Sequence, residues 1–214
     1  MARVYDHRDL VRLADAATVP IINGLSNLYH PCQILGDLLT LKEEKGHLEG
    51  LKLTYIGDGN NIANTLLLGC STIGINISLA TPLQYRPLQE SVEKAKDKAT
   101  KRGGTVELFE DPKEAVKGAD AIYTDTFVSA GMEDQRKTRL RIFMPKFQVN
   151  TELLKAAKSE AIVLHCLPAY REEEITGAVI DGPQSAVWKQ AENRLHVQKA
   201  ILILLLLNEK MLPW

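Results

Sequence analysis

The stretch LKLTYIGDGNN, residues 51–61, decides the fold that the rest of the chain follows. Its first half is an apolar run suited to a strand buried on both faces, and the two glycines of GDG allow a tight turn before a helical pattern begins. A doubly wound sheet presents its first strand in this order and binds ligands beyond the carboxyl ends of its strands. We therefore expect Asp58, Asn60 and Asn61 to lie nearest to a bound ligand.

The same order of strand and helix repeats along the chain. We expect an α/β fold that is Rossmann-like and doubly wound, with a mainly parallel sheet and flanking helices. Residues 126–148 carry few strand signals, and a segment of this length usually serves as a lid or binding loop. The expected strands cover residues 19–22, 51–56, 75–81, 105–109, 119–124, 161–165 and 185–188, and the expected helices 8–16, 30–45, 62–70, 88–102, 111–117, 151–158 and 191–207.

Composition narrows the class of protein. The 214 residues are 45% hydrophobic, which is enough for a sizeable core. A net charge of -1 with interspersed Lys and Glu gives no basic field for nucleic acid. The longest apolar run, residues 201–207, is too short to span a membrane, and the first residues lack the core of a signal peptide. Three cysteines in apolar or motif contexts favour reduced thiols and a cytoplasmic location.

The sequence HPCQ, residues 30–33, opens a helix whose amino end would present free N–H groups beside an imidazole and an amide. That combination suits an anion or a polarised carbonyl oxygen. The alternative is that Pro31 simply starts the helix and His30 caps it. At the other end of the chain, residues 201–207 are apolar on all faces, which predicts burial against two surfaces.

Three polar points fall where expected strands end, and they allow several kinds of site. The GDG turn resembles the start of a dinucleotide motif, but Ile62 replaces its third glycine and no acidic residue follows the second strand. The His and Cys residues lack the usual spacing of metal ligands. A Cys166 nucleophile paired with His165 is disfavoured because neighbouring residues of a strand point to opposite faces. Buried packing of Cys166 stays an equal alternative.

Five motifs in this order resemble the ornithine carbamoyltransferase family over essentially the whole chain: HPCQ at 30–33, GDGNN at 57–61, DxxxSxG at 125–131, HCLP at 165–168 and AENR at 191–194. The resemblance implies an ornithine-binding Rossmann-like domain at 46–190, preceded by a linking helix at 30–45. Residues 1–29 resemble the edge of the family's amino-terminal domain. Residues 191–214 would form a helix that packs on that domain.

By this resemblance the substrates are ornithine and carbamoyl phosphate, with no metal or other cofactor. The side-chain amine of ornithine attacks the carbamoyl carbon, and phosphate leaves after a tetrahedral intermediate. The resemblance makes His30, Gln33 and Arg194 the residues that hold and polarise the carbamoyl group, while Asn61, Asp125, Ser129 and Ala130 lie at the ornithine head and Cys166 and Leu167 lie beside its side-chain amine.

Two departures from the family pattern stand out. The family's SMG reads Ser129-Ala130-Gly131 here, so the methionine of its closing loop is missing. The Ser-Thr-Arg-Thr-Arg phosphate-binding run does not occur, and we expect the amino-terminal carbamoyl-phosphate domain to be absent and the chain to be inactive alone. The intact family is trimeric, so a homo-oligomer is expected. The alternatives are a non-catalytic binding or scaffold module, or a carbamoyltransferase for aspartate or putrescine.

Overall fold

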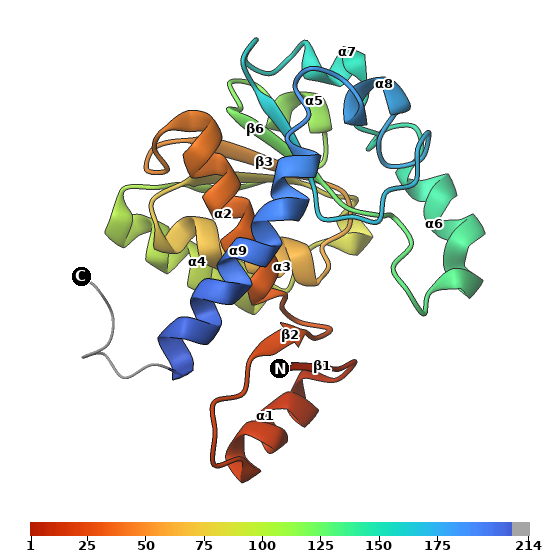
Figure 1. The fold of residues 1–214 in the computed structure, drawn as a ribbon. Coiled ribbons are helices and arrows are strands. Elements are labelled where there is room, and N and C mark those ends of the chain that lie inside the picture. Colours follow the sequence, from red (N-terminus) through yellow and green to blue (C-terminus); the bar gives the residue numbers. More distant parts are fainter. Residues whose placement is uncertain (207–214) are drawn as a thin grey trace.

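The computed structural model describes residues 1–206 of the chain. Its main sheet has five parallel strands in the order β5-β4-β3-β6-β7, with helices on both faces (Figure 1). The strands are β1 (Ala2–Arg3), β2 (Asn23–Leu25), β3 (Lys52–Ile56), β4 (Asn76–Ala80), β5 (Val106–Phe109), β6 (Ala121–Thr124) and β7 (Ile162–His165), and the helices are α1 (His7–Ala16), α2 (Pro31–Lys45), α3 (Asn61–Thr72), α4 (Gln89–Arg102), α5 (Pro112–Ala115), α6 (Arg136–Phe143), α7 (Thr151–Leu154), α8 (Gly177–Ile180) and α9 (Val187–Leu206).

The order of the strands places β3, the strand of the GDGNN motif, at the centre of the sheet. From β3 the chain first moves outward through β4 and β5, and then returns to the other side of β3 to form β6 and β7. The crevice between the carboxyl ends of β3 and β6 is therefore the switch point at which sheets of this kind bind ligands. The doubly wound parallel fold predicted from the sequence is confirmed.

Two apolar cores hold the helices against the sheet. One core joins α2, α3 and α4 to one face through residues such as Leu41, Leu67 and Ala95. The second core, on the other face, contains Phe143 of α6 and Val179 of α8. Strand residues supply both cores, because their side chains alternate between the faces and both faces are covered. Packing in the two cores holds in place the edge of the sheet that carries the polar motifs.

Some elements differ from the sequence expectation. Residues 19–22 form no strand, and the short strand is β2 at Asn23–Leu25, which pairs with β1. The strand expected at 185–188 is wrong, because Ser185 makes a single bridge to Val163 and α9 already begins at Val187. The segment 126–148 is also more ordered than a loop, since it contains α6 and contributes buried aromatic side chains to the second core.

The carboxyl end of α9 is apolar but exposed. Its helix packs along α2 through its first turns, whereas the side chains from Leu202 to Leu206 are 43–74% exposed. Burial of this stretch against two surfaces is thus not seen within residues 1–206. The expected extension of the helix to residue 207, and the rest of the segment to 214, lie outside the described residues. None of the described helices has the length and apolarity needed to cross a membrane.

Candidate active site

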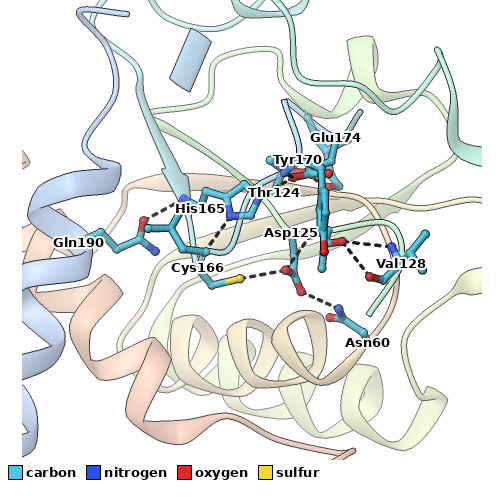
Figure 2. A network of polar contacts seen from close by, with 12 residues as sticks. Asn60, Thr124, Asp125, Val128, His165, Cys166, Tyr170, Glu174 and Gln190 are labelled. Carbon is cyan, nitrogen blue, oxygen red and sulfur yellow. Dashed lines mark hydrogen bonds and ion pairs between the residues drawn. The ribbon is translucent and has the colours of Figure 1, made fainter. Parts of the chain in front are cut away.

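Asp125 is the centre of a polar cluster at the switch point, directly after β6 (Figure 2). Its Oδ1 accepts hydrogen bonds from the backbone N–H of Thr126 at 2.7 Å and from the thiol of Cys166 at 3.0 Å. Its Oδ2 accepts a hydrogen bond from Nδ2 of Asn60 at 2.7 Å. The carboxylate is 6% exposed. Three motifs far apart in the sequence, GDGNN, DxxxSxG and HCLP, therefore meet at one carboxylate.

Asn60 contacts Asp125, although the motif assigned the neighbouring Asn61 to the substrate. Asn60 is the N-cap of α3, and its Oδ1 accepts from the backbone N–H of Ile62 at 2.9 Å, so its amide nitrogen is directed at Asp125. The side chain of Asn61 instead donates to the Ser26 carbonyl oxygen at 2.8 Å. The N-cap preference of asparagine just before a helix is the sequence signal that could have identified this arrangement.

Cys166 is a protonated hydrogen-bond donor in this cluster. Burial raises the pKa of its thiol well above the usual value, and the Asp125 carboxylate raises it further. Because the thiolate is the reactive form, the pKa disfavours a nucleophilic role. Its neighbour His165 points to the other side and contacts Glu174, so the two side chains do not pair, as the alternation of the strand predicted.

Asp58 does not face the ligand crevice as an open carboxylate, which corrects the expectation from the GDG turn. It forms a buried ion pair with the guanidinium of Arg139 on α6, and Arg139 is 3% exposed. The Nε of Arg139 also donates to the carbonyl oxygen of Phe127 at 2.5 Å. The ring of Tyr85 lies under the guanidinium, 4.6 Å from its carbon. Nothing in the spacing of the sequence indicated this contact across 81 residues.

Ser129 and Ala130 lie in the segment after β6 and stay apart from the cluster. The backbone carbonyl of Ser129 accepts a hydrogen bond from Met132 at 3.0 Å, and Ala130 is exposed. Leu167 follows Cys166 and is half-buried, with a left-handed backbone φ of 58°. The Ser129, Ala130 and Leu167 assignments therefore stay predictions.

His30, Gln33 and Arg194 come together where α2 begins beside α9. The guanidinium of Arg194 donates to Oε1 of Gln33, and His30 is buried at the N-cap of α2. Gly36 allows this approach, because a Cβ there would lie 3.0 Å from Cδ of Arg194. The imidazole makes no capping hydrogen bond, so the alternative that His30 merely caps the helix is not supported. The three predicted carbamoyl-binding residues are adjacent.

A buried carboxylate, Asp37, sets the orientation of Gln33. Its Oδ1 accepts from Nε2 of Gln33 at 2.8 Å and from Nε2 of Gln190 at 2.6 Å. Burial raises the pKa of Asp37 to about 6. Gln190 in turn accepts from the backbone N–H of His165 at 2.8 Å, so hydrogen bonds link the carbamoyl side to the HCLP turn. Asp37 lies four residues after Gln33 on one helix face, and this spacing was the overlooked signal.

The imidazole of His30 is neutral at physiological pH. Burial, together with the positive charges of Arg194 and Arg3, lowers its pKa from 6.5 to about 4. A neutral ring offers one N–H donor and one acceptor. Within residues 1–206, Nδ1 of His30 and Nε of Arg194 are buried and have no hydrogen-bond partner. Both unpartnered atoms are therefore available to a ligand at this place.

We expect the His30 ring to remain unprotonated between pH 8 and pH 5.5. Because its pKa in the folded chain lies below the unfolded value, folding favours the neutral ring, and the associated stability is lost as the pH falls toward 4. A titration of the ring carbon protons by NMR, with the signal assigned through His30→Gln, measures the pKa directly. A midpoint near 6.5 would contradict the buried, cation-flanked position.

The residues 1–206 contain no group of three or more His, Cys, Asp or Glu side chains placed to hold a metal ion. Cys32, Cys70 and Cys166 are free thiols in this structure, and their reduced state in solution stays a prediction. The polar groups at the site are thus amides, a carboxyl group and an amide that each contact an arginine, a thiol and an imidazole. Groups of this kind can bind and orient a polar organic ligand.

The fold and the cluster at the switch point define a Rossmann-like ligand-binding protein. Residues 49–205 match the model of the aspartate/ornithine carbamoyltransferase Asp/Orn binding domain, and residues 1–43 match that of the carbamoyl-P binding domain. The chain belongs to the aspartate/ornithine carbamoyltransferase family. The prediction that the carbamoyl-phosphate domain is absent is therefore wrong in part, because the first 43 residues match its family model.

Several similar proteins are named ornithine carbamoyltransferase or ornithine transcarbamoylase. An ornithine carbamoyltransferase of Bacillus subtilis is 54% identical over 94% of this chain and 63% of its own length. The structure of the Pyrococcus furiosus ornithine carbamoyltransferase is 51% identical, with a TM-score of 0.93 over 96% of this chain and 65% of its own. The Giardia lamblia ornithine transcarbamoylase structure is 31% identical with a TM-score of 0.88. The chain spans about two thirds of the length of these relatives.

Proposed function

We propose that this chain supplies the ornithine-binding part of a site that transfers a carbamoyl group from carbamoyl phosphate to the side-chain amine of ornithine. The products are citrulline and phosphate, as in arginine biosynthesis. The observation that carries this proposal is the Asp125 carboxylate, held by Asn60 and Cys166 at the switch point of the sheet. Relatives at 51–54% identity that bear the name ornithine carbamoyltransferase support it.

Asp125 suits the α-ammonium group of ornithine. A carboxylate has about four acceptor positions, and three are used by Asn60, Thr126 and Cys166. The remaining capacity can accept a cationic N–H, and these three donors keep the carboxylate in place. Ser129 and Asn61 are proposed to complete the contact with the head of the amino acid, and Ala130 adds a backbone contact in the same segment.

The carbamoyl group is proposed to bind at the start of α2. His30 and Arg194 supply donors to the carbonyl oxygen, which becomes negative in the tetrahedral intermediate, and each such donor is worth a few kcal/mol. Oε1 of Gln33 faces Arg194 because Asp37 takes its amide nitrogen, so Gln33 is an acceptor for the carbamoyl amide. The attacking amine must lose a proton from a pKa near ~10.4, and a desolvated pocket lowers that value.

Turnover by these 214 residues alone is not expected. The Ser-Thr-Arg-Thr-Arg run that would clamp the phosphate is absent from the sequence. Without residues that hold the phosphate, carbamoyl phosphate is not positioned for the reaction, and several kcal/mol of the barrier reduction that comes from positioning is lost. We propose that the chain binds ornithine and leaves the phosphate of carbamoyl phosphate without a partner.

We also propose a homo-oligomer, trimeric as in the intact family, and a cytoplasmic location. The exposed apolar end of α9 supports association, because contiguous apolar surface on a protein usually marks a contact site. Size-exclusion chromatography at high concentration is expected to show a species larger than one chain. A clean monomer would remove this argument.

The proposed function is tested by citrulline formation and by hydrogen exchange on the same sample. With both substrates we expect no citrulline, whereas ornithine alone should slow amide exchange in residues 126–148. Citrulline formation would show that the phosphate clamp is supplied by residues of this chain or its oligomer. No protection by ornithine would instead favour a scaffold module that kept the fold and lost the chemistry.

A further inference from the structure

The outer face of α9 carries an apolar stripe that no element of residues 1–206 covers. Figure 1 shows α9 at the front of the molecule, with α2 behind it. One face of α9 packs on α2 through buried residues such as Gln190 and Asn193. On the opposite face Trp188, Leu195 and Leu202 are 55%, 62% and 47% exposed. Contiguous apolar surface of this kind usually marks a contact with another molecule.

The spacing of the stripe is typical of a helix that pairs with a second helix. Trp188, Leu195 and Leu202 follow one another at intervals of seven residues, which is about two helical turns. The positions between them continue an alternation of three and four residues, and all but one of the whole set are apolar: Trp188, Ala191, Leu195, Gln198, Leu202 and Leu205. Side chains in this pattern pack between those of a neighbouring helix. The partner surface is therefore expected to be a helix that runs alongside α9.

Charged residues beside the stripe select the direction of that second helix. Glu192 and Lys199 follow Trp188 and Leu195 by four residues each, so they lie along the same edge of the stripe. Both are exposed, Glu192 has a contact of 3.7 Å with His196, and no ion pair reaches Lys199 within the described part of the chain. In an antiparallel pair of α9 helices, Glu192 of each chain lies opposite Lys199 of the partner subunit. A parallel pair would place like charges at the same level.

We propose that α9 pairs with α9 of a second copy of this chain in an antiparallel, two-fold contact. Such a contact is self-complementary, because every pair of opposed residues occurs twice. Leu195 lies close to the two-fold axis, and Trp188 of one chain lies opposite Leu205 of the partner subunit. This contact is separate from the trimer proposed above, because a two-fold contact joins chains in pairs. It does not depend on the binding of ornithine.

Sedimentation equilibrium over a range of chain concentrations measures the dissociation constant of the pair. Leu195→Asp places a charge in the middle of the apolar contact in both chains, and we expect it to weaken pairing by roughly 100-fold or more. The matched control is Leu83→Asp, because Leu83 is 60% exposed and lies outside α9. The control should change the dissociation constant by less than about twofold.

Charge reversal tests the direction of the two helices. Glu192→Lys alone and Lys199→Glu alone each set like charges opposite one another at both ends of an antiparallel pair, and each should weaken pairing about tenfold. A chain with both substitutions should pair as the parent chain does. An equal mixture of the two single variants should form a mixed pair, because opposite charges then face each other at both ends. Both side chains are exposed, so the fold of each variant should be unchanged.

A parent chain that stays monomeric at every concentration would overturn the proposal, and the stripe would then belong to a different partner. Association that Leu195→Asp leaves unchanged would also overturn it, because another surface would then hold the chains together. Single charge variants that pair as tightly as the parent chain, or a double variant that does not recover pairing, would overturn the antiparallel arrangement.

Discussion

Replacing Asp125 by alanine is expected to abolish ornithine binding while the chain stays folded. The carboxylate is the one group that Asn60, Thr126 and Cys166 all hold, and it is the proposed partner of the α-ammonium group. Truncation of one partner in a buried hydrogen-bonded charge pair costs about 2–5 kcal/mol, which is a loss of about 30-fold to several thousand-fold in affinity. Calorimetric titration with ornithine measures the loss.

The matched control for this prediction is Asp111→Ala. Asp111 is an exposed carboxylate that caps α5 and lies outside the cluster, so its removal takes away the same charge without the same contacts. Ornithine affinity should stay within about twofold in the control. Unchanged ornithine affinity in Asp125→Ala would remove Asp125 from the site, and an equal loss in both variants would assign the effect to net charge.

Replacing Arg139 by methionine is expected to destabilise the chain by about 3–5 kcal/mol, because it leaves Asp58 as a buried charge with no counter-ion. This is a large share of the 5–15 kcal/mol by which native domains are stable. The variant also releases the Phe127 carbonyl, which lies between Asp125 and Ser129 in the sequence. The free energy of unfolding, from urea titration, is the quantity to measure.

Arg136→Met is the control on the same helix. Arg136 pairs with Glu173, but its side chain is 43% exposed, and exposed ion pairs contribute about 0–1 kcal/mol. The two variants remove the same charge and add the same side chain, so their difference reports the buried contacts of Arg139 with Asp58 and with the Phe127 carbonyl. Similar unfolding free energies for both variants would contradict an anchoring role for the Arg139–Asp58 pair.

The sequence was sufficient for the fold because the strands are short apolar runs covered on both faces. Leu53, Ile77 and Leu164 are buried in the strands that the pattern predicted, and the glycines supplied the turns. Gly59 shows how strict this chemistry is, because a Cβ there would lie 2.2 Å from the backbone nitrogen of Pro87. The strand expected at 185–188 failed because an isolated apolar run does not distinguish a strand from the first turn of a buried helix.

The site was predicted less completely, and the reason is physical. Motifs placed Asp125 and Cys166 correctly at the ends of strands, since strand order brings those ends together. The contacts of Asp58 with Arg139 and of His165 with Glu174 depend on how a loop folds back over the sheet. Local periodicity carries no information about such contacts. Residues that hold the site residues in place are therefore the ones that only the structure identifies.

The most direct test of this account is a calorimetric titration of the unmodified chain with ornithine, without carbamoyl phosphate. We predict saturable binding of one ornithine per chain, which Asp125→Ala removes and Asp111→Ala retains. Such a result would establish that the cluster at Asp125 holds the amino acid without the other substrate. Absence of binding by the folded chain, or binding that survives Asp125→Ala, would contradict the central claim that this cluster is the ornithine site.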